Sequence, residues 1–301
     1  MRGKKTRVPL KDGDYTPDYE TLRKTAWLLY RHTSVTYIAR MTEMLAGFAK
    51  GFNAYLAKDD DPDILGDYLS GCYACLDELN RGMAKLRKAD PTGFRLIRLG
   101  LSFRDTFDRA MWEYNFEPLG FYGSAKPSRG LWLWMEGAMA MSLKIGGGLC
   151  GRLSYPLFDV SKYAFPAQIG GYPLSKEIFI KSGDDIPFTG IWQPISLKGG
   201  CPNFLLRGEK APKAKIPILR IDTAAWVENL GEGLGVKQRA AHSDFDMAEF
   251  PTVWQLIEED ERWKNGREPL GEFEYVADPL TQFPKEPPVA LEDPPKDDLL
   301  D

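Results

Sequence analysis

The chain has 301 residues, of which 43% are hydrophobic and 27% are charged. This composition is close to that of an average globular protein and excludes a fibrous or wholly disordered chain. The 39 basic and 43 acidic residues give a net charge of −4, which argues against nucleic acid as the main partner. The sequence holds two histidines, His32 and His242, whereas most hydrolases and metalloenzymes depend on histidine. We therefore expect a folded protein that is not an enzyme and that needs no cofactor or metal.

The sequence gives no signal for export or for a membrane segment. The basic N-terminus is not followed by the apolar stretch of a secretory signal. The most apolar run, Leu131 to Leu143, is shorter than the about 18 residues that cross a membrane, and it contains Glu136. We expect a cytoplasmic protein with reduced, mostly buried thiols at Cys72, Cys75, Cys150 and Cys201.

After an N-terminal extension over residues 1–16, helical periodicity dominates residues 17–148. Apolar residues three or four positions apart predict one helix face that consists of Ile38, Met41, Leu45, Phe48, Phe52 and Tyr55. A second helix begins at the capping pair Asp61–Pro62 and continues to Leu86. Short connections between such helices favour an antiparallel bundle.

Two further helices are predicted before the sequence changes, at residue 149, to a pattern with frequent prolines. Asp90–Pro91 repeats the start signal ahead of a third apolar stripe from Phe94 to Tyr114. A fourth helix is expected from about Ser128 to Leu143, ended by the glycines at 146–148.

Residues 149–278 have the pattern of an antiparallel sheet with long loops, because frequent prolines exclude long helices there. One or two helical turns are expected around Asp222–Leu230, and the proline- and acid-rich tail over 279–301 is predicted to be extended or disordered. The fold class is therefore α+β, with a helical bundle packed on an antiparallel sheet region. The predicted strands are Glu177–Lys181, Ile191–Ile195, Phe204–Arg207, Ile216–Ile221 and Thr252–Ile257.

The cysteines offer two candidate sites for metal binding, redox chemistry or catalysis. Cys72 and Cys75 have the spacing of metal and redox motifs, but the sequence supplies no second pair of ligands, so we interpret them as core residues of a helix. Cys201 and His242, with Asp244 or Asp246, have the residue types of a nucleophilic site. A cysteine-dependent enzyme is therefore kept as an alternative function.

Two charged stretches are candidate interaction surfaces. Basic residues from Arg81 to Arg109 alternate with acids at helical spacing, which is typical of a solvated helix face. Four adjacent acids that repel one another favour a functional role more than scattered acids do, and an acidic patch steers a basic partner. This run is a candidate partner-binding site, with a solvated strand end as the alternative, and consists of Glu258, Glu259, Asp260 and Glu261.

The most distinctive pattern lies between Pro187 and Arg267. It combines a strand that enters a proline turn, a Gly-Gly-Cys-Pro-Asn turn that leads into another strand, and a tryptophan-bearing strand. This stretch resembles the C-terminal module of immunity proteins from bacterial polymorphic-toxin and type VI secretion systems, in particular immunity protein families 71 and 72. Its motif residues have the character of turns and anchors, and they are Gly190, Trp192, Pro194, Gly200, Cys201, Pro202, Asn203 and Trp254.

The resemblance implies a protein that binds one secreted toxin and neutralises it by stoichiometric occlusion. Such a protein needs a binding surface and no catalytic histidine, which agrees with the composition. The expected partner is then a cognate protein toxin, with no nucleic acid and no membrane involved. A general protein-interaction adaptor is a further alternative. The identity of the toxin and the oligomeric state are left open by the sequence.

Overall fold

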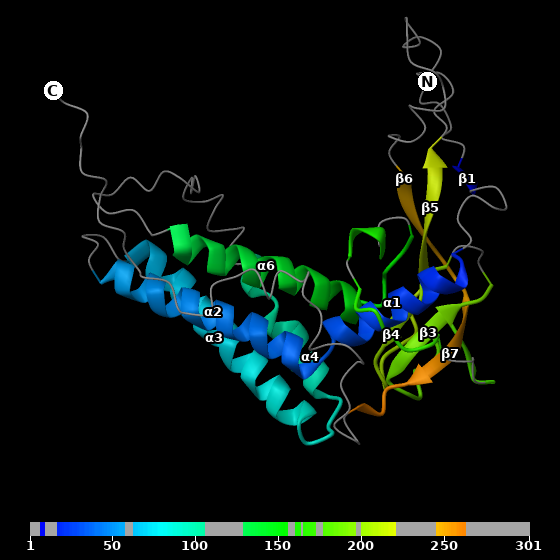
Figure 1. Cartoon of the computed structure of the whole chain (residues 1–301), viewed down its shortest axis with the longest axis horizontal. Coiled ribbons are helices and arrows are strands. Elements are labelled where there is room, and N and C mark those ends of the chain that lie inside the picture. Colours follow the sequence, from blue (N-terminus) through cyan, green and yellow to red (C-terminus); the bar gives the residue numbers. More distant parts are fainter. Residues whose placement is uncertain are drawn as a thin grey trace, which may run out of the picture. The chain divides into compact units, whose positions relative to one another are not determined.

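The computed structural model describes residues 7–9, 17–57, 63–105, 129–155, 160–163, 165–172, 177–196, 200–220 and 245–262. Apart from one short strand near the N-terminus, helices precede the strands of the antiparallel sheets along the chain, which confirms the α+β class (Figure 1). The chain divides into two compact units, each made of separate segments. Unit 1 consists of Met1–Ala26, Gly151–Lys162 and Gly171–Glu259, and unit 2 consists of Trp27–Cys150, Tyr163–Gly170 and Asp260–Asp301.

The predicted division at 148/149 lies close to the break between Cys150 and Gly151, but the units are not contiguous halves of the chain. The predicted 1–16 extension contains a short strand, β1 (Arg7–Pro9), which pairs with a strand of the C-terminal half. Unit 1 therefore combines the N-terminal segment of the chain with segments that follow the predicted helical region.

The first two helices begin at residues whose side chains cap them. The Thr21 N–H donates to the Asp18 carboxylate at the start of the first helix, and the Tyr37 N–H donates to the Ser34 hydroxyl at the start of the second. In unit 2, α2 (Val35–Leu56) contacts α3 (Asp63–Leu86) and α6 (Arg129–Leu149), and α3 contacts α4 (Gly93–Gly100) (Figure 1). The helices are α1 (Tyr19–His32), α2 (Val35–Leu56), α3 (Asp63–Leu86), α4 (Gly93–Gly100) and α6 (Arg129–Leu149).

The apolar stripe predicted for α2 is confirmed as core. Its first five members, from Ile38 to Phe52, are at most 1% exposed, and the side chain of Tyr55 lies outside the described part. Phe48 stacks on Phe52 with ring centroids 5.3 Å apart, and Tyr68 of α3 meets both rings edge-on. Aromatic packing therefore joins α2 to α3.

The expectation that the glycines at 146–148 end the last helix is wrong, because α6 continues to Leu149. The Cys150 N–H donates to the Gly146 carbonyl, and the chain turns at Gly151, whose φ is +65°. Gly148 instead serves packing, since a Cβ there would lie 3.4 Å from the Thr33 side chain. A left-handed conformation at Gly151, rather than the number of glycines, decides where the helix ends.

The third predicted helix is also shorter than its apolar stripe. α4 ends at Gly100, and the Leu101 N–H donates to the Ile97 carbonyl as its cap. Glycine has a low helix propensity, and the Gly100 Cα lies so close to α3 that an added Cβ would be 2.9 Å from the Cys75 carbonyl oxygen. The part of the stripe beyond residue 105 lies outside the described residues.

In the described part of unit 1 the strands form two antiparallel sheets. The three-stranded sheet has the order β1-β5-β6, with β5 at Ala214–Arg220 and β6 at Phe245–Phe250. The predicted strands are confirmed within a few residues, whereas β1 and β6 were not predicted, and the expected turn at Asp222–Leu230 and the tail over 279–301 lie outside the described residues. The four-stranded sheet has the order β2-β7-β3-β4 and contains Phe179–Lys181, Val253–Glu259, Gly190–Pro194 and Asn203–Leu205.

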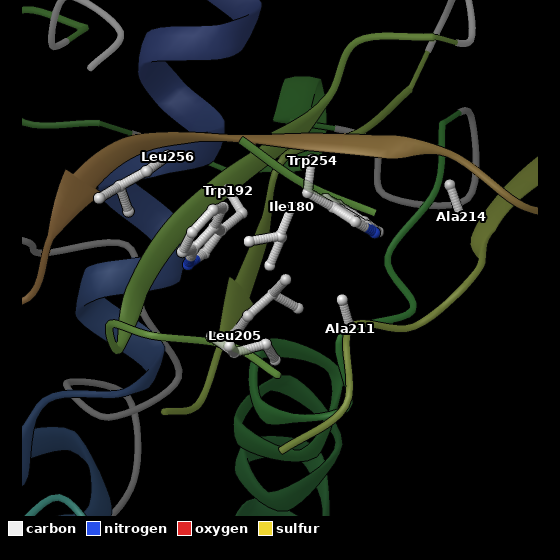
Figure 2. Packing of buried hydrophobic residues seen from close by; sticks show 8 residues of the cluster. Ile180, Trp192, Leu205, Ala211, Ala214, Trp254 and Leu256 are labelled. Carbon is white, nitrogen blue, oxygen red and sulfur yellow. The ribbon is translucent and has the colours of Figure 1, made fainter. Parts of the chain in front are cut away.

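The four-stranded sheet carries the core of unit 1. The burial pattern alternates along β2 and at the start of β7, so one face of these strands is buried. The buried side chains come from β2, β3, β4 and β7, from the loop between β2 and β3, and from the start of β5 and the segment before it, and Figure 2 shows them gathered together. They are Ile180, Ile186, Trp192, Leu205, Ala211, Ala214, Trp254 and Leu256.

Candidate functional site

The residues of the predicted immunity-type motif come together in the four-stranded sheet. Trp192 of β3 lies opposite Asn203 of β4 on one side and Leu256 of β7 on the other. Pro194, at the end of β3, lies opposite Trp254 of β7. Segments far apart in the sequence therefore meet as neighbouring strands of one sheet.

The two motif tryptophans are buried anchors of this sheet (Figure 2). Both are 0% exposed. The Trp192 indole N–H donates to the Phe188 carbonyl at 3.2 Å, and the Trp254 indole N–H donates to the Pro212 carbonyl at 2.8 Å. Each indole buries its apolar rings and satisfies its polar atom, so both tryptophans have an architectural role.

Close packing also constrains the Gly-Cys-Pro-Asn turn. A Cβ on Gly200 would lie 2.4 Å from a ring carbon of Pro194 and 2.9 Å from the Pro194 carbonyl oxygen, so only glycine fits there. Cys201 and Pro202 follow as buried residues, and β4 begins at Asn203. The turn fixes the end of β3 against the start of β4.

The side chain of Asn203 forms the hydrogen bonds with the segment after α6 that a neighbouring strand would otherwise form. Its side-chain oxygen accepts the Leu153 N–H at 2.6 Å, and its side-chain amide donates to the Leu153 carbonyl at 3.2 Å. The same amide donates to the Cys201 carbonyl at 2.9 Å. Because Asn203 is 1% exposed, these bonds satisfy backbone groups that water does not reach.

Cys201, the candidate nucleophile, lies inside unit 1 with its thiol protonated. It is 1% exposed, and burial raises its pKa far above the ordinary range, while a hydrogen bond with Tyr155 opposes this shift. The Tyr155 hydroxyl lies 2.7 Å from the Thr25 hydroxyl. Because the thiolate is the reactive form, this environment disfavours nucleophilic chemistry. His242, Asp244 and the side chain of Asp246 lie outside the described residues, so their pairing with Cys201 stays a prediction.

Cys72 and Cys75 are core residues of α3, as predicted. Both are buried, and burial raises the pKa of the Cys72 thiol to about 11. The Cys75 sulfur lies 3.4 Å from the Ser102 hydroxyl. Cys150 is exposed. Within the described residues no group of three or more histidine, cysteine and acidic side chains is placed to hold a metal ion.

The acidic run predicted to bind a partner does not form one exposed patch. Glu258 and Glu259 are half-buried residues at the end of β7, and Glu261 is exposed. Asp260 is buried, with its carboxylate oxygens 2.8 and 2.9 Å from nitrogens of Arg262. The expected role of Asp260 at a partner surface is therefore corrected, because its charge is used within the fold.

Arg262 docks at the junction of α1 and α2 in unit 2. Its guanidinium donates to the Tyr30 carbonyl and, at 2.9 Å, to the Thr33 hydroxyl. It also lies 4.5 Å from the centre of the Tyr30 ring, within cation–π range. The sequence shows Arg262 as one charge among several, and its anchoring role depends on contacts with residues more than two hundred positions away.

His32 lies buried at the same junction and was not predicted to have a role. Its ring centre is 5.2 Å from that of Tyr37 and 5.9 Å from that of Tyr163. Burial, helped by the positive charges of Lys144 and Arg31, lowers its pKa well below the ordinary value. In the sequence, a short polar stretch between two amphipathic helices has the pattern of an exposed loop. The burial of His32 therefore could not be predicted from this pattern.

The basic stretch behaves in part as predicted. Arg81 pairs with Glu78 at 3.0 Å and with Asp77 at 3.7 Å, and Lys85 pairs with Asp90 at 3.0 Å. These are pairs between exposed or half-buried side chains on a helix and its following turn. Arg109 lies outside the described residues.

No helix in the described residues has the length and apolar character needed to cross a membrane. Comparisons of the chain with protein-family models, with curated proteins and with solved structures found no match.

Proposed function

We propose that this chain is an immunity protein that acts in the cytoplasm, where it binds a cognate antibacterial toxin and neutralises it by stoichiometric occlusion. The proposal rests on the resemblance of the Pro187–Arg267 stretch to immunity modules. The geometry adds one supporting observation. The motif residues are buried anchors and turns of one sheet, as an architectural module requires, and Trp192 and Trp254 lie at its centre.

An immunity protein of this kind works through a surface rather than a reactive group. Stable protein complexes bury about 1,200–2,000 Å² in total, and a few aromatic and arginine side chains supply most of the affinity. The sheet around Trp192 and Trp254 has a packed core, and a preformed surface loses less conformational freedom when it binds a partner.

Co-expression tests the proposal directly. The reading frame next to this gene is expressed from an inducible promoter in a bacterial host, alone and together with the full chain. We expect growth arrest with the neighbouring product alone, recovery with the chain present, and co-purification of the two proteins. A toxic neighbour that the chain neither rescues nor binds contradicts the proposal.

A second experiment, with a variant at Cys201, separates this function from the alternative of a cysteine-dependent enzyme. Cys201→Ala removes the only atom with which this residue could act as a nucleophile, while an alanine is tolerated sterically at a buried position. Neutralisation by stoichiometric binding predicts that the variant rescues growth at the same ratio of the two proteins, provided that its melting temperature shows a folded chain. Rescue that is lost in a folded C201A variant favours the enzyme.

A further inference from the structure

One face of the four-stranded sheet in unit 1 carries exposed apolar side chains. Phe179 of β2 is 51% exposed, and Ile195, the residue after β3, is 47% exposed. Val253 of β7 is half-buried and lies opposite Lys181 of β2, and its carbonyl accepts the Ile195 N–H at 2.9 Å. Alternation along the strands places these residues on the face that is turned away from the core of unit 1.

Along β2 the same face has a symmetric charge pattern. The Leu256 N–H donates to the Ile178 carbonyl, so the pairing with β7 begins before Phe179. Alternation then places Glu177, Phe179 and Lys181 on one face, and all three are exposed. At about 3.4 Å per residue, the acid and the base lie about 7 Å on either side of Phe179 along the strand.

The three side chains are available to a partner. In the part of the chain that the structure describes, the side chains of Glu177, Phe179 and Lys181 have no hydrogen bond, ion pair or ring contact. The Lys181 backbone, in contrast, is occupied, because its N–H donates to the Asp184 carboxylate at 2.8 Å and its carbonyl accepts the Asp184 N–H at 2.9 Å. This turn closes the edge of β2 beside Lys181, so a partner meets the face of the strand rather than its edge.

A second copy of this chain has the charges that this face requires. A two-fold axis that crosses β2 at Phe179 reverses the direction of the strand. Glu177 of each copy then faces Lys181 of the other, and the two Phe179 side chains meet at the centre. The face is therefore its own complement, as an interface with two-fold symmetry requires. With one acid and one base it has no net charge, so it does not select an acidic or a basic partner as an electrostatically steered interface does.

We propose that this face, which consists of Glu177, Phe179, Lys181, Ile195 and Val253, is the contact surface between two copies of the chain. Phe179 is the apolar centre, and two Glu177–Lys181 pairs flank it. Val253 and Ile195 extend the apolar area over the neighbouring strands. Interface centres are enriched in aromatic side chains, and charges around them fix the register of the two partners. This assembly does not depend on the proposed toxin binding.

Reversal of single charges tests the proposal. In E177K both flanking pairs become pairs of bases, and in K181E both become pairs of acids. We expect the dissociation constant of the dimer, measured by sedimentation equilibrium of the full chain, to rise at least about tenfold in each variant. The double variant E177K/K181E exchanges the charges and restores both pairs, so its dissociation constant is expected to lie within about threefold of the wild-type value.

A mixture of the two single variants adds a test that a folding defect cannot imitate. One variant brings two bases and the other brings two acids, so the mixed dimer is expected to form more tightly than either variant with itself. Phe179→Ala is expected to weaken the dimer about tenfold or more. K213E changes an exposed lysine elsewhere in unit 1 and is the matched control, with an expected change of less than about threefold.

Three results contradict the proposal. A wild-type chain that stays monomeric up to about 100 μM forms no such dimer. A wild-type dimer that E177K, K181E and Phe179→Ala all retain, in variants that melt like the wild type, uses another surface. A monomeric wild-type chain whose binding to the inactivated product of the neighbouring reading frame is lost in Phe179→Ala assigns this face to that protein instead of a second copy.

Discussion

At the scale of single residues, the buried polar side chains have the clearest consequences. Asn203 satisfies the N–H and the carbonyl of Leu153 at once. Asn203→Ala leaves both backbone groups, and the Cys201 carbonyl, without this partner inside the protein. We expect the free energy of unfolding to fall by about 2–4 kcal/mol, measured by urea denaturation. Asn80→Ala, at an exposed position of α3, is the control and is expected to change it by less than about 0.5 kcal/mol.

His32 predicts a specific dependence of stability on pH. Burial first, and then Lys144 and Arg31, lower its pKa in the folded chain, whereas the unfolded chain has a pKa of about 6.5. Above that pH neither state binds the proton. As the pH falls below it, the unfolded state binds a proton that the folded state does not, so the free energy of unfolding decreases.

The expected slope is up to about 1.4 kcal/mol for each pH unit below 6.5, until the pKa of the folded state is reached. Carboxylates add their own slope at lower pH, so the measurement compares denaturation of the wild type and of His32→Gln between pH 7 and 5. The difference between the two curves isolates the histidine. Parallel curves over this range contradict the buried, neutral state of His32.

At the scale of the element, the α3–α4 hairpin depends on glycine for its close contact. Gly93→Ala places a Cβ 2.4 Å from the Gly82 carbonyl oxygen and 2.8 Å from the Leu86 side chain. The helices must separate, and we expect a loss of about 1–3 kcal/mol in the free energy of unfolding. Gly146→Ala is the matched helical control, because its Cβ meets only Leu101 at an ordinary 3.6 Å.

For Gly146→Ala the helix propensity of alanine is expected to raise stability by up to about 1 kcal/mol. Thermal melting of both variants checks the contrast in sign. Equal effects of the two substitutions would show that contact between the backbones of α3 and α4 does not constrain the hairpin.

The buried pair of Asp260 and Arg262 anchors the end of the described chain in unit 2. Removing only the arginine, as in Arg262→Met, leaves the carboxylate of Asp260 buried without this cation, and we expect a loss of about 3–5 kcal/mol. The double variant D260N/R262M removes both charges and is expected to recover part of that loss. Urea denaturation of the two variants measures the difference, and a double variant no more stable than Arg262→Met contradicts a charge-based cost.

Sequence patterns predicted the elements better than their ends and contacts. Periodicity identified α2 because its stripe from Ile38 to Phe52 faces one way, and short β-like runs between prolines identified the strands that bear Trp192 and Trp254. The end of α6 depended on the left-handed φ of Gly151, which a run of glycines does not reveal. β6 was not predicted from the sequence because it contains an aspartate, an alanine and a glutamate and no β-branched residue.

At the scale of the whole molecule, contacts between distant segments decide the organisation. β1 pairs with β5, and Leu153 pairs with the Asn203 side chain, so each compact unit is assembled from segments that are separate in the sequence. Local periodicity carries no information on such pairings, which is why the sequence predicted contiguous halves. The candidate site shows the same limit, because the buried state of Asp260 follows from Arg262 and its contacts with the α1–α2 junction.

The proposed function requires that the chain bind one toxin at fixed stoichiometry. Its most direct test is isothermal titration of the purified full chain with the purified, catalytically inactivated product of the neighbouring reading frame. Stoichiometric binding predicts saturation at a fixed ratio of the two proteins, with a dissociation constant in the nanomolar range or below, which corresponds to a binding free energy of about −12 kcal/mol or stronger. The absence of heat and of a co-eluting complex, with both proteins shown to be folded, would contradict it.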